Sequence, residues 1–103
     1  MTKNFRQTLL FAALFGSAPT YAVLPEGGNV VAGEATISSR PGRMDINQST
    51  NRAVIDWQSY NVGPSDHVYY HQNSGDCILN RVIGGNYSSI EGQIHGLNVG
   101  IVN

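Results

Sequence analysis

Apolar and polar residues alternate along much of the chain beyond residue 28, which predicts short extended segments with one buried face. In the clearest case Ala53, Ile55 and Trp57 share one face at period two, while Val54 and Asp56 share the other. Turn-forming Gly, Asn, Ser or Pro residues bound each segment, as is typical of strands. The pattern predicts eight strands, at Asn29–Ala32, Glu34–Ser38, Met44–Gln48, Arg52–Gln58, His67–Gln72, Cys77–Val82, Ser89–His95 and Val99–Val102.

An all-β chain follows, because no segment after residue 22 shows convincing 3.6-residue periodicity. Strand spacing of about nine residues fits a sandwich, a barrel or a parallel β-helix equally well. Two features favour the β-helix. Its narrow core requires small or aliphatic inward residues, which we expect at Ala35, Ile37, Ile46, Ile55, Ile90 and Ile94. Asparagines that bond neighbouring coils and accommodate left-handed backbone are expected at the strand ends, at Asn47, Asn61, Asn80 and Asn103.

The first 22 residues have the pattern of a secretory signal peptide. Two basic residues precede a short apolar run over 9–15, Pro19 interrupts any helix, and small residues occupy positions 20 and 22. The run is too short to span a bilayer, which takes roughly 20 residues. We therefore expect cleavage between Ala22 and Val23 and a mature domain over 23–103; the alternative is a buried N-terminal helix.

Charge and cysteine content narrow the classes of function. Six basic residues against seven acidic ones give a net charge of −1, and removal of Lys3 and Arg6 makes the mature chain more acidic. Such a chain lacks the electrostatic footprint of a nucleic-acid-binding protein. Cys77 is the only cysteine, so no disulfide forms within the chain. Its alternation with Leu79 predicts a small buried side chain, and Trp57 is predicted to pack in the core.

Motifs for catalysis or metal binding are weak. His67 and His71 lie four residues apart in a predicted strand, on one side of it, without an accompanying Cys-x-x-Cys or Glu-x-x pattern. We expect solvated strand histidines there. The scattered carboxylates, including Glu26, Glu34 and Glu91, do not form a recognisable catalytic pair. The sequence therefore predicts neither an enzyme nor a cofactor.

Four ordered blocks of sequence carry a specific resemblance. They are Leu-Pro-Glu-Gly-Gly-Asn-Val-Val-Ala-Gly at 24–33, Met-Asp-Ile-Asn-Gln-Ser through Tyr-Asn-Val-Gly at 44–63, Leu-Asn-Arg-Val-Ile-Gly-Gly-Asn at 79–86, and Ser-Ser-Ile-Glu-Gly-Gln-Ile at 88–94. Together they resemble the N-terminal secretion domain of filamentous haemagglutinins and related two-partner-secretion exoproteins.

The resemblance implies a right-handed parallel β-helix capped at its N-terminus. It implies export through the periplasm to the cell surface or medium, and recognition by the periplasmic domains of an outer-membrane transporter. Host-cell surfaces would be contacted through downstream regions of the exoprotein. By the same resemblance, the residues for transporter recognition or family-specific structure are Arg52, Trp57, Asn61, Asn80, Arg81 and Asn103. The two arginines either pair with acidic groups of the transporter or bond turn carbonyls within the β-helix.

Two departures from the family lead us to expect a truncated domain that contains only the first coils. The strand that ends at Asn103 normally continues as Asn-Pro-Asn-Gly, and an aromatic residue is usual near Gly100. The alternatives are a fragment of a secreted carbohydrate-active β-helix enzyme and a non-functional truncated remnant.

Overall fold

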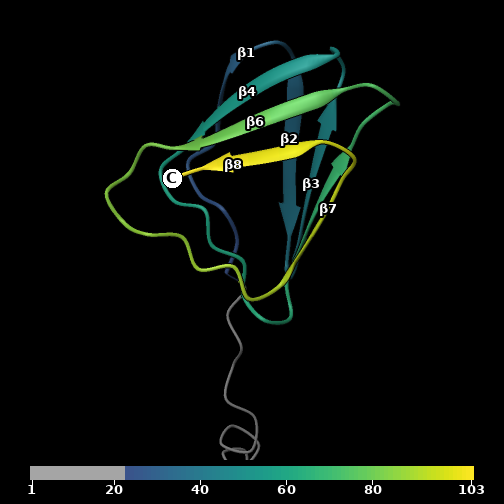
Figure 1. Ribbon diagram of the computed structural model, residues 1–103. Coiled ribbons are helices and arrows are strands. Elements are labelled where there is room, and N and C mark those ends of the chain that lie inside the picture. Colours follow the sequence, from purple (N-terminus) through teal and green to yellow (C-terminus); the bar gives the residue numbers. More distant parts are fainter. Residues whose placement is uncertain (1–22) are drawn as a thin grey trace, which may run out of the picture.

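The structure, a computed structural model, describes residues 23–103, so the predicted signal peptide lies outside the described residues. Eight strands make up about half of this region, and all eight predicted strands are present (Figure 1). Their bounds are β1 (Asn29–Ala32), β2 (Ala35–Arg40), β3 (Arg43–Gln48), β4 (Arg52–Trp57), β5 (His67–His71), β6 (Cys77–Val82), β7 (Gln93–His95) and β8 (Val99–Val102). Residues 23–103 contain no helix of the length and apolar character needed to cross a membrane.

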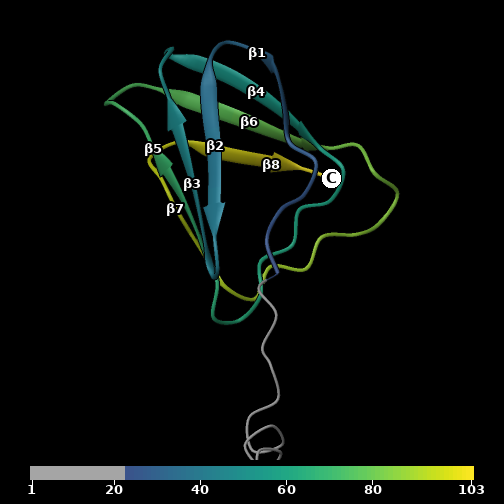
Figure 2. The same cartoon turned by 180° about the vertical axis from the view of Figure 1, so that it is seen from behind.

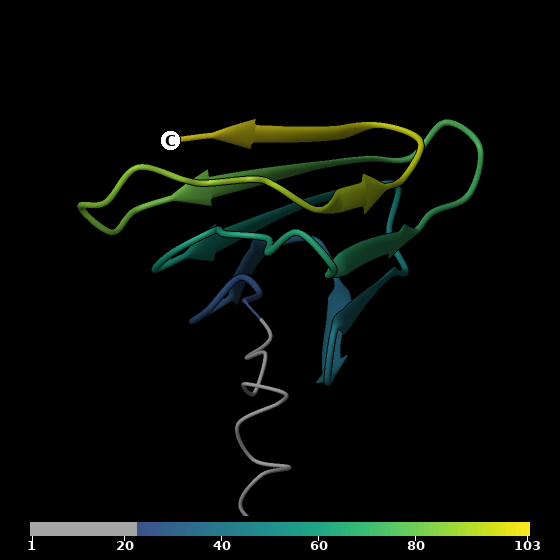
Figure 3. The same cartoon turned by 90° about the horizontal axis from the view of Figure 1, so that it is seen from below.

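The strands form two four-stranded sheets, in the orders β1-β4-β6-β8 and β2-β3-β5-β7. The first pair in each sheet, β1 with β4 and β2 with β3, is antiparallel, and every later pair is parallel. After β3 the chain therefore visits the two sheets alternately and adds one strand to each per coil. Figure 3 shows the coils stacked, with the yellow C-terminal coil farthest from the blue N-terminal residues. The predicted all-β fold with a β-helical architecture is confirmed, while its handedness stays a prediction.

Loops close the third side of the coil, opposite the corner where the two sheets approach each other (Figures 1 and 2). Segments 58–66 and 83–92 lie side by side there, and the Val62 amide donates to the Ser89 carbonyl at 3.0 Å. Residues 23–26 pair with 58–63 on the same side through an antiparallel bridge between Glu26 and Ser59. N-terminal residues thus cover all three sides of the first coil and form the expected cap.

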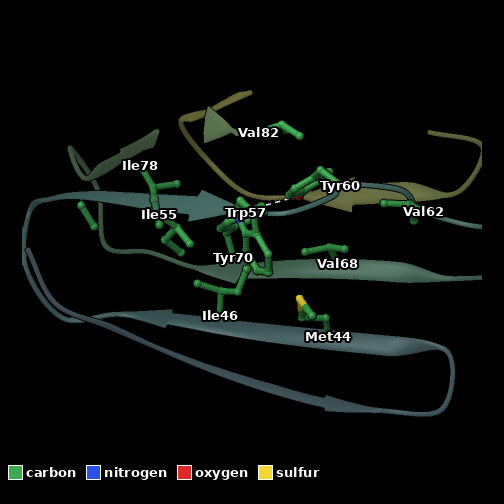
Figure 4. Packing of buried hydrophobic residues seen from close by; sticks show 11 residues of the cluster. Met44, Ile46, Ile55, Trp57, Tyr60, Val62, Val68, Tyr70, Ile78 and Val82 are labelled. Atoms are coloured by element: carbon green, nitrogen blue, oxygen red, sulfur yellow. Dashed lines mark hydrogen bonds between the residues drawn. The ribbon is translucent and has the colours of Figure 1, made fainter. Parts of the chain in front are cut away.

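Buried apolar side chains fill the space between the sheets and the third side (Figure 4). The alternation read from 52–58 is correct, since Ala53, Ile55 and Trp57 are all at most 3% exposed. The core consists of Met44, Ile46, Ala53, Ile55, Trp57, Tyr60, Val62, Val68, Tyr70, Ile78 and Val82. Ala35, Ile37 and Ile94, also predicted to face inward, are partly buried against it.

The expectations about Cys77, Ile90 and the backbone of the asparagines are wrong. Cys77 is exposed, because β6 turns Ile78 inward and leaves positions 77 and 79 on its outer face. Ile90 is 44% exposed, because it lies on the third side in an isolated bridge rather than in a strand. Positive φ angles among residues 23–103 occur only at glycines, so the asparagines adopt no left-handed backbone.

Candidate functional site

Asn80 lies in the middle of the core, although the sequence placed it at a strand end. Its side chain is fully buried on the inner face of β6. The Oδ1 atom accepts hydrogen bonds from Trp57 Nε1 at 2.9 Å and from the Tyr70 hydroxyl at 3.0 Å. The Nδ2 atom donates to the Gly100 carbonyl at 3.1 Å. One amide therefore connects β4, β5 and β6 with β8, the strand of the next coil.

A second phenol extends this network. The Tyr60 hydroxyl lies 2.6 Å from that of Tyr70, and its ring packs edge-to-face against Trp57 with centroids 5.6 Å apart. Because the Tyr70 hydroxyl donates to Asn80, it accepts the hydrogen bond from the Tyr60 hydroxyl. We call Trp57, Tyr60, Tyr70 and Asn80 the Asn80 cluster (Figure 4 labels its three aromatic members). Every one of these polar groups has a partner, as buried polar atoms require.

Burial within the Asn80 cluster has a consequence at high pH. It raises the pKa of Tyr60 to about 12, and burial together with the neighbouring Tyr60 raises the pKa of Tyr70 further. The folded state therefore holds these protons more tightly than the unfolded chain. Their contribution to stability is complete below the ordinary tyrosine pKa of about 10 and is lost as the pH rises through the raised values.

We expect the free energy of unfolding to fall above about pH 10, by up to about 1.4 kcal/mol per pH unit for each phenol that stays protonated. Urea titrations between pH 8 and 12, followed by far-ultraviolet circular dichroism, measure this slope. Tyr60→Phe should make the slope shallower. Tyr87→Phe, which changes a side chain that is 95% exposed, should leave it unchanged. Equal slopes in all three chains would contradict the assignment.

The two motif arginines lie on the outer face of the β1-β4-β6-β8 sheet. Arg81 forms a bidentate ion pair with Asp56 across β4 and β6, with N–O distances of 2.6 and 2.9 Å. Hydrogen bonding to this carboxylate raises the pKa of the Arg81 guanidinium. Arg52 is exposed, opposite Cys77, and forms no ion pair with residues 23–103. Thus Arg81 has a partner that neither sequence interpretation named, and Arg52 presents a free positive charge.

An apolar groove of about 490 Å³ adjoins Arg52 on this face. Val54 and Leu79 contribute its apolar wall, and Gly100 lies opposite Leu79 in the register of β6 with β8. The missing side chain at this glycine leaves the groove open beside Leu79, where the family usually has an aromatic residue.

Two further motif residues join coils on the third side. Asn61 accepts a hydrogen bond from the Ser89 amide at 2.7 Å, and Asn103 donates to the Ser88 hydroxyl at 3.0 Å. The six motif positions therefore do not converge on one patch. Trp57 and Asn80 meet in the core, Asn61 and Asn103 bond Ser89 and Ser88 on the third side, and the two arginines lie on the outer face.

The opposite sheet carries an aromatic and charged array that the sequence did not predict. The Tyr69 ring stacks on His95 with centroids 4.3 Å apart, and the Arg43 guanidinium lies 3.8 Å from the centroid of the same ring. Hydrogen bonds from Arg43, and then from His71, hold the pKa of the Asp45 carboxyl well below its usual range. The contacts cross β3, β5 and β7, so they depend on a strand register that composition does not reveal.

His67 and His71 share one side of β5, as their spacing predicts, but they have different partners. His67 Nδ1 lies 3.1 Å from His95 Nε2, whereas His71 contacts Asp45 at 2.8 Å. No group of three or more potential metal ligands occurs within the described range 23–103.

Comparison with known proteins gives consistent matches. The sequence model of a family described as TPS secretion domain matches residues 22–103. Two curated relatives, both heme/hemopexin-binding proteins of Haemophilus influenzae, are 40% identical over 72 residues and 35% identical over 89 residues. The matches cover 69% and 84% of this chain but only 8% and 9% of the relatives. The crystal structure of the HMW1 secretion domain from Haemophilus influenzae matches with a TM-score of 0.70 at 26% identity, over 77% of this chain and 22% of that one.

Proposed function

This chain belongs to the family of two-partner-secretion (TPS) secretion domains. We therefore propose that the periplasmic domains of a dedicated outer-membrane transporter bind and recognise residues 23–103. One observation carries the proposal: the family match begins at residue 22 and runs through the whole capped β-helix. An exported protein that bears this domain is thereby directed across the outer membrane. The role is recognition rather than catalysis.

We further propose that residues 1–22 are a signal peptide that is cleaved after Ala22, and that the exoprotein is of the haemagglutinin or adhesin type. Contacts with host cells then belong to regions outside 23–103. The alternative of a carbohydrate-active enzyme fragment has less support, since the family match already accounts for the sequence from residue 22 onward.

Burial of the motif residues bears on the form in which the chain is recognised. Trp57 and Asn80 are at most 1% exposed in the folded domain, so a receptor can reach them only before folding is complete. Recognition of an extended segment by pairing with a receptor strand gives affinity through the backbone and specificity through alternate side chains. Folding outside the cell then starts from the cap and proceeds coil by coil.

Release of the chain in the presence and absence of the cognate transporter tests this function. We expect the product of the full 103-residue chain to appear in the medium only when the transporter is co-expressed. Replacement of residues 52–63 by a Gly-Ser segment of equal length should abolish release, because it removes most of the longest family block, 44–63. Equal release without the transporter would refute the proposal.

We expect substitution of the two arginines to affect transporter binding differently. In the folded chain Arg52 is free on the surface whereas Arg81 is already paired with Asp56. To the extent that the transporter binds the folded chain in buffer, Arg52→Ala should therefore weaken binding more than Arg81→Ala does. An exposed ion pair is worth up to about 1 kcal/mol, which corresponds to about a fivefold change in Kd. In urea the Asp56 pair is lost, and the two variants should then behave alike.

Titration of the transporter's periplasmic domains with each chain, in buffer and in urea, measures the Kd values to be compared. Arg40→Ala serves as the matched control, because Arg40 is an exposed arginine outside the four family blocks. Binding that is unchanged for both motif variants in both solvents would exclude the arginines and leave the strand backbone as the determinant.

A further inference from the structure

Asp66 is a buried carboxylate at the junction of the third side with β5. Only 7% of the residue is exposed, and no basic side chain among residues 23–103 forms an ion pair with it. Its Oδ2 atom instead accepts a hydrogen bond from the backbone nitrogen of Val23 at 2.7 Å. A buried carboxylate without a countercharge is costly, and here no positively charged group offsets the burial of Asp66.

The surroundings leave little room for any other partner. A Cβ atom at Gly63 would lie 2.6 Å from Asp66 Oδ2, and one at Gly42 would lie 3.6 Å from Oδ1. Backbone therefore encloses the carboxylate on these sides. Its neighbours Gly42, Gly63 and Gln93 carry no titratable side chain, and the ring of the adjacent His67 has its own partner, His95 Nε2, at 3.1 Å. Within residues 23–103 the hydrogen-bond donor to the carboxylate is therefore the Val23 nitrogen.

Val23 is also the residue that becomes the N-terminus if the signal peptide is removed as proposed above. Cleavage converts its neutral amide nitrogen into an α-ammonium group, whose ordinary pKa of about 7.7–8.0 keeps it mostly charged at neutral pH. We infer that Asp66 is the docking site for the α-ammonium group that processing creates on Val23. This inference rests on the cleavage site within the proposed function, and not on the transporter.

The backbone around the pair is arranged to hold it. The Gly63 amide donates to the Val23 carbonyl at 2.9 Å, which fixes the first residue of the mature chain against the third side. The Asp66 carbonyl accepts from the Gln93 amide at 3.1 Å, at the start of β7 in the next coil. The ion pair thus joins the mature N-terminus to the first two coils, and processing completes the cap from which folding proceeds.

Titration of the α-amino group in the exported, processed chain tests the inference. The pKa of this group, followed by competitive amine labelling or by nuclear magnetic resonance after ¹³C-methylation, should exceed its ordinary value by at least about one unit, a tenfold shift in proton affinity. Asp66→Asn should restore the ordinary value. Asp76→Asn is the matched control: Asp76 is equally buried but accepts from the Asn73 amide in a remote turn, so its replacement should leave the shift unchanged.

A second variant covers the case in which Asp66→Asn fails to fold. Insertion of one Ser between Ala22 and Val23 moves the ammonium group by one residue while Asp66 and the Val23 amide hydrogen bond remain. The ordinary pKa should return in this chain also. An unshifted pKa in the wild-type chain, a shift that survives both variants, or a processed chain that begins at a residue other than Val23 would each overturn the inference. Transporter-dependent release is scored separately, so failure of one proposal is distinguishable from failure of the other.

Discussion

Asn80→Leu should reduce the free energy of unfolding by about 3 kcal/mol or more, since a buried polar group left without a partner costs about 1–3 kcal/mol. Leucine has a similar volume, so the loss does not come from a cavity. It comes from the indole N–H of Trp57 and the carbonyl of Gly100, both of which lose their hydrogen-bond partner at Asn80. Urea unfolding of the processed chain, followed by the fluorescence of its single tryptophan, measures the difference.

Asn47→Leu is the matched control for this substitution. Asn47 also lies in a strand, β3, but its side chain is exposed on the outer face. We expect a change within about 0.5 kcal/mol there, as for most surface substitutions. If Asn80→Leu proved equally mild, then the Asn80 cluster would not be holding the coils together.

The strands could be predicted from the sequence because each has one buried face. The period-two alternation in 52–57 results directly from that burial, and the bounds of β6 and β8 agree with the prediction to the residue. The buried face of a strand was harder to infer than the presence of the strand. The sequence predicts Cys77 and Leu79 on the inner face of β6, although the fully buried residue of that strand is a polar one, Asn80.

Contacts between coils could not be predicted, because they depend on the length of the intervening loops. Arg81 finds Asp56, and Tyr69 finds His95, only when parallel strands are aligned in a particular register. The burial of Asp66 could not be predicted for the same reason. In the sequence Asp66 is one polar residue of a turn, and its burial next to Val23 becomes apparent only when residues 23–26 fold back along 58–66.

Trp57→Ala should separate folding from recognition. Trp57 is 1% exposed, packs against Tyr60 and donates to Asn80, so its truncation should cost about 3–5 kcal/mol of stability. Transporter-dependent release should nevertheless persist, because the transporter is proposed to bind the chain before it folds. The released variant should then be digested rapidly by an external protease that the wild-type chain resists.

Trp57→Phe provides the matched comparison, since it retains an aromatic ring in the core and removes only the indole N–H and part of the volume. Its released product should show intermediate protease sensitivity and unchanged release. Binding of the periplasmic domains in urea, where none of the three chains is folded, decides what Trp57 itself contributes. Loss of binding for Trp57→Ala under those conditions would make this side chain a direct contact of the transporter, and its burial in the folded domain would then help the transporter to release its substrate once folding begins.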